Sequence, residues 1–314
     1  MLHQLISLGS RLAGKNKLSI LIYHQVLERL DDMRPGEPDQ EQFDWQMSLI
    51  SRYFTPLPLG EAIERLQAGT LPPKAVCITF DDGYLNNLTL AAPILKRYGV
   101  PATVFVASAF SQGENMWNDK VLDLFEQADS DVIDCEAIGL GKLSLADGAS
   151  RRQLAYKTIG VLKYLPVQER LEKIAALYAA NGDIQISRKM MSEQEIRQLS
   201  ELGIEIGAHT HNHPILKGMS PQAVREEIAE NVRLLESWTG KQVKSFAYPN
   251  GKPGKDFDEH TVEVVKEFPF KQAVSTEWGV SRPGADLYRL KRFTPWDRTP
   301  LKFHLRMLLN LIKH

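Results

Sequence analysis

A short apolar run that ends in two adjacent carboxylates constrains this chain more than any other stretch. Residues 75–80 (AVCITF) are followed at once by Asp81, Asp82 and Gly83. An apolar run of this length, closed by a turn residue, is typical of a buried strand. In α/β proteins such strands present functional groups where the strand ends and the loop begins. Two adjacent acids repel each other unless a cation or proton intervenes, which indicates a functional site; a helix N-cap is the alternative.

A second apolar run ends in a concentration of histidine. Residues 204–208 (IEIGA) lead into His209, His211 and His213, which are three of the eight histidines in the chain. Imidazole and carboxylate groups are ligands for zinc and similar metals, and three protein ligands beside an open position form the catalytic pattern. Exposed loop histidines are the alternative. Together the two strand ends favour a metal site.

The rest of the chain alternates apolar strand patterns with amphipathic helix patterns. Strands are predicted at 18–24, 75–80, 102–107, 204–208, 244–249, 272–276 and 289–293, and helices at 41–53, 59–68, 87–98, 192–202, 220–238 and 256–268. This rhythm indicates parallel strands joined by crossover helices. Residues 113–190 break the rhythm with three further predicted helices, near 117–128, 149–163 and 166–181. We therefore expect one domain over residues 1–314 with a helical insertion at about 113–190.

Composition restricts the partners and the compartment. The chain has 314 residues, 43% hydrophobic and 25% charged, which is ordinary for a soluble globular protein. A net charge of −1 gives no field that recruits nucleic acid, so no nucleic-acid partner is predicted. Two cysteines, Cys77 and Cys135, do not support a disulfide framework. Because no secretory signal or spanning apolar run is visible, we expect a cytoplasmic protein. The amphipathic ends, 1–15 and 299–313, either pack on the body or contact a partner or a membrane surface.

The two strand ends resemble the first two motifs of the polysaccharide deacetylases, the NodB-type carbohydrate esterases of family 4. The family pattern Thr-Phe-Asp-Asp-Gly is present at 79–83, and His-Ser/Thr-x-x-His-Pro at 209–214. Both match fully and in the family order, and the resemblance covers roughly residues 17–295. It implies the distorted (β/α)₇ barrel of the NodB type, with the site at the carboxyl ends of the strands. It also implies removal of N-acetyl or related acyl groups from amino sugars of a polysaccharide, glycoconjugate or lipid-linked precursor.

The resemblance assigns roles to the residues of these two motifs. Asp82, His209 and His213 correspond to the metal ligands of the family, and Asp81 corresponds to its general base. A base at Asp81 works at neutral pH because water at a metal has a lowered pKa. His211 stands at a variable position and is not expected to be a ligand. Zinc is the default metal for these donors, and Co²⁺, Ni²⁺ and Fe²⁺ suit them too.

The later family motifs are incomplete here. Ala247 stands where the third motif has an arginine that orients the base, so that role passes to another cation, with Arg289 and Arg292 as candidates. Asn250 stands at the tyrosine position, whose backbone N–H contacts the oxyanion. The Leu-x-His whose histidine protonates the leaving amine is not found. We expect His24, which closes the first predicted strand, to be the general acid; a structural histidine is the alternative.

Two other functions stay open at this point. One is a C–N hydrolase acting on a non-sugar amide, because a fold does not determine a substrate. The other is a non-catalytic carbohydrate-binding pseudoenzyme, which the missing arginine and histidine favour. Trp117, at the start of the insertion, either stacks on a sugar ring or lies in the core. No feature of the sequence indicates an oligomeric state.

Overall fold

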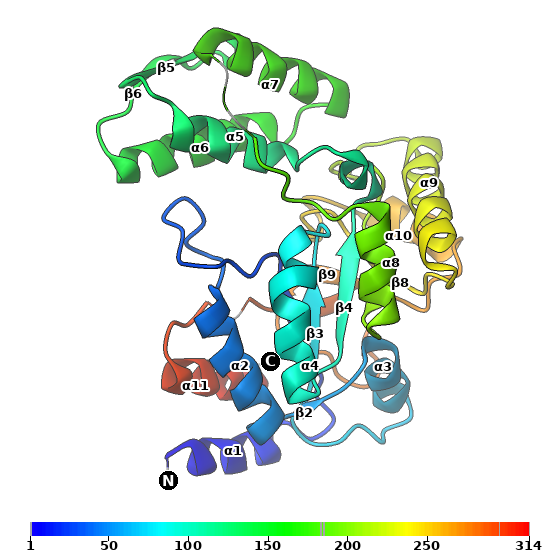
Figure 1. Ribbon diagram of the computed structural model, residues 1–314. Coiled ribbons are helices and arrows are strands. Elements are labelled where there is room, and N and C mark those ends of the chain that lie inside the picture. The colour runs from blue at the N-terminus through cyan, green and yellow to red at the C-terminus, as the bar shows by residue number, and fades with distance from the viewer. Residues whose placement is uncertain (1, 183, 185, 295, 314) are drawn as a thin grey trace. The chain divides into compact units, whose positions relative to one another are not determined.

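The computed structural model describes residues 2–182, 184, 186–294 and 296–313 (Figure 1). Their contacts divide the chain into two compact units. The barrel unit consists of Met1–Arg29, Gly36–Gln112 and Met191–His314, and the insertion unit of Leu30–Pro35 and Gly113–Met190. The expectation of a single domain stays a prediction, because contacts do not test whether the units fold independently.

Among the described residues, seven parallel strands form the wall of the barrel unit. In spatial order they are β1 (Ser19–Tyr23), β3 (Ala75–Phe80), β4 (Ala102–Val106), β7 (Glu205–Ala208), β8 (Ser245–Ala247), β9 (Gln272–Trp278) and β10 (Leu290–Arg292), with the short β2 (Thr55–Pro56) paired to the start of β3. The wall nearly closes where the Phe293 backbone exchanges hydrogen bonds of 3.0 and 3.1 Å with Ile20 and Ile22 of β1. The predicted distorted (β/α)₇ barrel is confirmed.

Helices cover the outside of this wall, and every residue of β1, β3 and β4 is buried, as parallel strands covered on both faces require. The covering helices are α2 (Gln40–Tyr53), α3 (Leu59–Gln67), α4 (Ala92–Tyr98), α8 (Glu193–Glu201), α9 (Pro221–Thr239) and α10 (Glu259–Lys266). The predicted helix 87–98 is present, and its first turn is π-helical over Asn87–Ala91 before α4 begins. Pro93 lacks the N–H that an α-helix would donate to the carbonyl of residue 89, so the regular ladder cannot run through this point.

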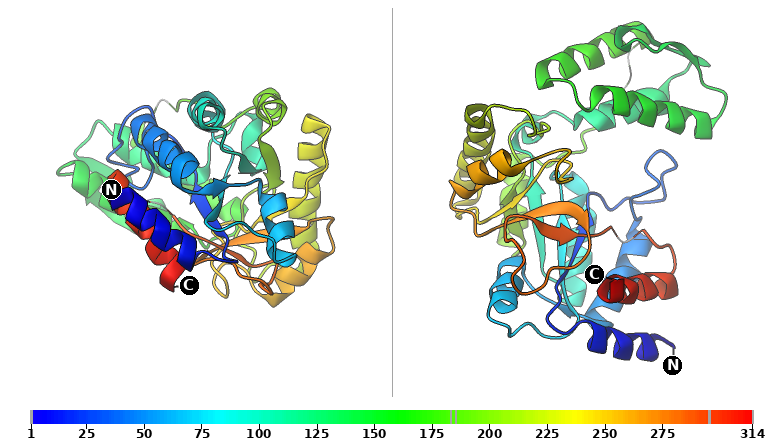
Figure 2. Two further views of the ribbon diagram at one scale, coloured as in Figure 1. Left: turned by 90° about the horizontal axis from the view of Figure 1, so that it is seen from below. Right: turned by 180° about the vertical axis from the view of Figure 1, so that it is seen from behind.

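Two terminal helices, α1 (Leu2–Ala13) and α11 (Pro300–Lys313), pack side by side on the flank of the barrel unit (Figure 2). The buried face of α11 meets α2, where Phe303 lies edge-on to Trp45 with ring centroids 5.7 Å apart. Packing on the body, one of the two alternatives for these segments, is therefore present. Among the described residues, each helix is either too short or too polar to span a lipid bilayer.

The insertion unit has a core of its own around α5 (Trp117–Gln127), α6 (Gly148–Leu162) and α7 (Val167–Asn181). Trp117 is buried there, with the Arg170 guanidinium 4.6 Å from its ring centroid, which fits the core alternative for this residue. Between α5 and α6, where the sequence analysis predicted no strand, β5 (Val132–Cys135) and β6 (Gly141–Ser144) pair as an antiparallel hairpin. Four-residue strands are too short to give a clear alternation in sequence.

Candidate active site

The functional residues predicted from sequence gather at the carboxyl ends of neighbouring strands. Asp81 and Asp82 follow β3, His209 follows β7, and His24 follows β1 directly. Asn250 lies three residues beyond β8. Because parallel strands of a barrel end at the same rim, residues far apart in the sequence meet there.

Three of these side chains converge tightly. The Nε2 atoms of His209 and His213 each lie 3.4 Å from Oδ1 of Asp82, and all three side chains are buried. In a tetrahedral site with ligand bonds of about 2.1 Å, two ligand atoms are about 3.4 Å apart, which is the spacing seen here. Asp82 Oδ1 accepts no hydrogen bond from any described residue. A buried carboxylate oxygen left in this state between two imidazoles fits a divalent cation.

The hydrogen bond on the far side of His209 determines which ring nitrogen faces Asp82. Its Nδ1 lies 2.7 Å from the carbonyl oxygen of Ala247. Because a carbonyl oxygen only accepts, Nδ1 donates this hydrogen bond, and Nε2 is the ring nitrogen that faces Asp82. This is the orientation that a metal-binding imidazole needs.

Backbone strain is concentrated in the same loops. Outside glycine, six described residues have positive φ, and four of them are Asp82 (75°), Thr210 (63°), His213 (52°) and Asn250 (58°). Each such conformation costs on the order of 1–3 kcal/mol and persists only where the surroundings hold it. The rim is therefore a strained segment that depends on supporting hydrogen bonds.

Two residues of α9 supply that support, and the sequence analysis missed both. Asn231 is fully buried; its Oδ1 accepts from the His209 backbone N–H at 3.0 Å, and its amide donates to the Val106 carbonyl at 2.9 Å. Glu227 accepts from the backbone N–H groups of His211 and Asn212 at 3.0 and 2.8 Å. A signal existed for Asn231, because it occupies the otherwise apolar face of the predicted helix 220–238.

Asp81 forms a buried, bidentate ion pair with Arg292 of β10. The Nη1 and Nη2 atoms of Arg292 each donate to one carboxylate oxygen of Asp81 at 2.7 Å, and Arg292 is fully buried. Burial acts to raise the pKa of Asp81, but the charge and hydrogen bonds of Arg292 outweigh it and hold that pKa below its ordinary value. Of the two cations predicted to orient Asp81, Arg292 makes the contact. The prediction of Arg289 was wrong, since Arg289 pairs with Glu259 and Asp286.

His24 is half-buried, with its Nδ1 3.9 Å from a carboxylate oxygen of Glu37. Desolvation lowers the pKa of His24, but the carboxylates of Asp82, Glu37 and Asp81 raise it, and the net result is above the ordinary value. His24 is thus within electrostatic reach of both aspartates, as expected for a residue on the same rim.

Two other predicted positions have partners of their own. His211 places its Nδ1 2.9 Å from the Ser108 hydroxyl and is not part of the cluster of Asp82 with His209 and His213. The Asn250 carbonyl accepts a hydrogen bond from the Thr276 hydroxyl at 2.7 Å, which anchors the turn after β8.

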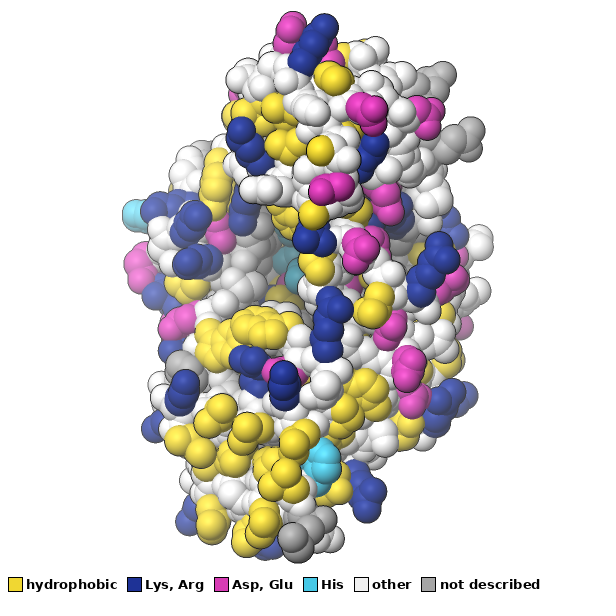
Figure 3. Space-filling view, turned by 90° about the vertical axis from the view of Figure 1, so that its left-hand side faces the viewer, with side chains coloured by type: hydrophobic (Ala, Val, Ile, Leu, Met, Phe, Trp, Pro, Cys, Tyr) yellow, Lys and Arg dark blue, Asp and Glu magenta, His cyan; other side chains and the backbone are white. Residues whose placement is uncertain are grey.

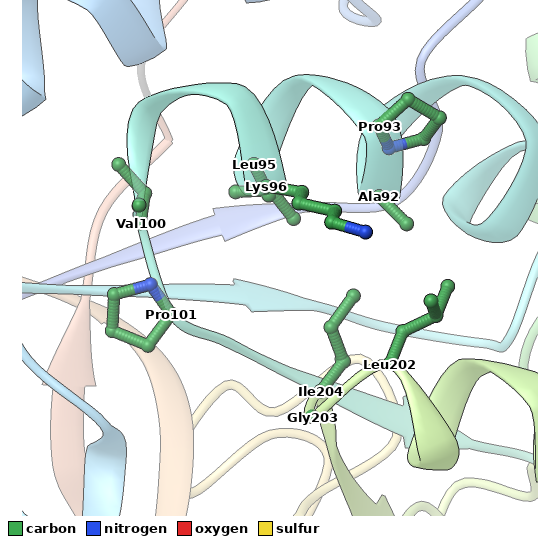
Figure 4. A pocket seen from close by; sticks show the side chains of 10 residues that line it. Ala92, Pro93, Leu95, Lys96, Val100, Pro101, Leu202, Gly203 and Ile204 are labelled. Atoms are coloured by element: carbon green, nitrogen blue, oxygen red, sulfur yellow. The ribbon is translucent and has the colours of Figure 1, made fainter.

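A pocket of about 730 Å³ lies at the other end of the strands (Figure 4). It is lined by Pro93 and Lys96 of α4 and by Pro101 and Ile204, which precede β4 and β7. None of the converging site residues borders this pocket. The predicted site residues therefore lie away from this pocket, at the carboxyl rim.

Comparison with known proteins gives consistent matches. The family model described as polysaccharide deacetylase matches residues 68–133 and 162–273. The Bacillus subtilis protein YxkH, which carries the name of a polysaccharide deacetylase, is 23% identical over 276 residues, covering 88% of this chain and 70% of YxkH. The Streptococcus pyogenes deacetylase PplD, solved with acetate, superposes with a TM-score of 0.61 at 19% identity, covering 93% and 98% of the two chains. IcaB from Ammonifex degensii gives 0.59 at 20% identity, covering 94% and 97%.

Removing the cation from the buried pair tests its energetic role. We expect Arg292→Gln to lower the free energy of unfolding by about 3–5 kcal/mol at neutral pH, because Asp81 is left buried and unpaired. The depressed pKa of Asp81 means that the pair stabilises the fold above the unfolded-state pKa and loses this effect as pH falls through the folded-state value. The difference in free energy of unfolding between the wild-type protein and Arg292→Gln should therefore shrink below about pH 4. Urea unfolding at a series of pH values measures this difference.

The matched control is Arg289→Gln, which removes a partly exposed arginine from a surface ion pair. It should cost less than about 1 kcal/mol. Equal losses for the two variants at neutral pH would contradict the account of Arg292.

Proposed function

This chain belongs to the polysaccharide deacetylase family, whose members hydrolyse the amide bonds of acetylated sugars, and from that premise we propose that it is a metal-dependent deacetylase of an N-acetylated amino sugar. The observation that carries the proposal is the convergence of Asp82, His209 and His213 beside the Asp81–Arg292 pair. A binding module has no need for a ligand set and a carboxylate base at one rim.

Asp82, His209 and His213 would hold the metal, with Zn²⁺ as the default and Co²⁺, Ni²⁺ or Fe²⁺ suited to the same donors. When bound there, a divalent cation supplies Lewis acidity toward an amide carbonyl and toward water. The three residues fit this role because their ligand atoms all lie within 4.8 Å of one another and are buried.

Asp81 is the general base of the proposed reaction. Arg292 holds its carboxylate ionised and restricts its orientation, so that it can take a proton from the attacking water. The family arginine that Ala247 replaces would otherwise do this. The missing arginine, which favoured a pseudoenzyme, thus has a substitute from another strand.

His24 is the proposed general acid, which delivers a proton to the leaving amine. Its raised pKa keeps the imidazole protonated to higher pH than usual, and this is the form that an acid requires. The backbone N–H of Asn250, in the turn after β8, is the proposed donor to the oxyanion that develops at the carbonyl.

The proposed substrate is an amino sugar within a polysaccharide, glycoconjugate or lipid-linked precursor, and the proposed acyl group is acetyl. The acetate bound by PplD is in line with this choice. Acetate release from a panel of N-acetylated sugars, oligosaccharides and lipid-linked sugars tests the proposal. Release from non-sugar amides alone would instead favour the alternative C–N hydrolase.

The ligand set is tested by two histidine variants from the same loop. His213→Ala should lose both bound metal and acetate release, because it removes one of three protein ligands. His211→Ala is the matched control and should keep both, since it removes only a contact to Ser108. Metal content by mass spectrometry and acetate release are measured on the same samples. Equal metal in the two variants would show that His213 is not a ligand.

The acid is tested by His24→Gln, which removes the titrating group and retains a polar side chain. Turnover should fall by roughly 10²–10⁴-fold, the usual contribution of acid–base catalysis, while bound metal is unchanged. The pH profile of turnover should also lose the limb due to His24. Turnover near that of the wild-type protein would reject His24 as the acid.

A further inference from the structure

Helices α1 and α11 form one two-helix layer on the flank of the barrel unit. Nδ1 of His3 lies 2.9 Å from Nδ1 of His304, and the two rings stack with centroids 5.2 Å apart. Leu308 packs over Gly9, where a Cβ would lie 3.4 Å from Leu308 Cδ2. Lys17 donates a hydrogen bond to the carbonyl of Leu311. The helices thus hold each other through one side and leave a second side uncovered.

The uncovered side is strongly apolar on both helices. Each of its eight large hydrophobic side chains is at least 40% exposed: Leu2, Leu5, Leu8 and Leu12 on α1, and Leu301, Leu305, Leu309 and Ile312 on α11. We call these eight residues the leucine face. Hydrophobic side chains gather in the lower part of Figure 3, the level at which α1 and α11 lie in Figure 1. Contiguous exposure of this kind marks an interaction surface.

The helical spacing makes the leucine face continuous. With about 100° between successive residues, the four leucines of α1 fall within one arc that includes Gly9 near its edge, and the four residues of α11 within one arc that borders Leu308. Since Gly9 and Leu308 are in contact, the two arcs meet along the seam between the helices. The outer edges carry basic residues: Arg11 on α1, and Lys302 and Lys313 on α11.

Charge separates this surface from the rest of the molecule. Residues 1–18 and 298–314 contain seven Lys and Arg and no Asp or Glu, whereas the remaining chain has a net charge of −8. Asp297, just outside, pairs with Arg306. Trp296 is 49% exposed, and the Arg306 guanidinium carbon Cζ lies 5.0 Å from the centroid of its ring. An apolar stripe between basic edges, with an exposed tryptophan nearby, is the pattern of helices that lie in a membrane interface.

We propose that the leucine face docks the protein on an anionic lipid surface, with α1 and α11 lying in the plane of the interface. The leucines enter the boundary between headgroups and acyl chains, and Arg11, Lys302 and Lys313 meet anionic headgroups. A second copy of the chain fits less well, because a symmetric pair would bring the basic edges of both copies together. The surface contains none of the site residues, so docking is separable from catalysis.

Flotation of the full chain with vesicles tests the proposal. The protein should float with phosphatidylcholine vesicles that contain phosphatidylglycerol, and more weakly with phosphatidylcholine alone. The four-serine variant carries Leu5→Ser, Leu12→Ser, Leu305→Ser and Leu309→Ser. Its partition coefficient between vesicles and water should be lower than that of the wild-type protein by roughly tenfold or more. Replacing Arg11, Lys302 and Lys313 by Gln should lower the partition coefficient roughly fivefold per charge removed, and only on anionic vesicles.

The matched control carries Leu171→Ser and Leu202→Ser, which alter leucines of similar exposure elsewhere, and it should bind as the wild-type protein does. Because the substituted side chains are exposed, each variant should unfold at the wild-type urea midpoint. The proposal is overturned if the wild-type protein does not float with anionic vesicles, or if the four-serine variant binds equally well. A wild-type dimer that the serine substitutions convert to monomer, with no vesicle binding, would assign the leucine face to self-association. The measurement needs no catalytic activity, so its outcome is independent of the proposed function.

Discussion

The buried ion pair between Asp81 and Arg292 is the interaction on which the rest of the rim depends. It joins β3 to β10, the last strand before the wall meets β1, and it is desolvated on both sides. Charges removed from water are tolerated only when they are paired and fully hydrogen-bonded. Arg292 is paired with Asp81 and donates from all three guanidinium nitrogens, because Nε bonds the Ser275 carbonyl at 2.9 Å and Nη1 also bonds the Thr79 hydroxyl at 3.1 Å. The same ion pair therefore links the end of β3 to β10 and holds the pKa of the proposed base, Asp81, below its ordinary value.

A second layer of hydrogen bonds holds the strained loop that carries the two histidines. Asn231 connects the His209 backbone to the end of β4, and Glu227 holds the next turn of the loop. Both come from α9, which packs outside the wall. The loop that carries His209 and His213 is therefore supported from behind by hydrogen bonds from a single helix.

The sequence predicted what is local and missed what depends on tertiary packing. The strand ends at Asp81 and His209 were visible because an apolar run stops at polar residues within one short window. The partner of Asp81 is 211 residues away, and nothing near Arg292 distinguishes it from Arg289. Asn231 is recognisable in retrospect as a polar residue on an apolar helix face. The β5–β6 hairpin has strands too short to give a pattern.

The most direct test of the account compares the wild-type protein with Asp81→Asn, measuring bound metal and acetate release on the same preparations. If Asp81 is the base beside a metal held by Asp82, His209 and His213, both proteins should bind about one metal ion per chain. The variant should lose roughly 10²-fold or more of its turnover, because an amide cannot accept the proton. Wild-type turnover in the variant, or a wild-type protein that binds no metal after reconstitution, would contradict the account.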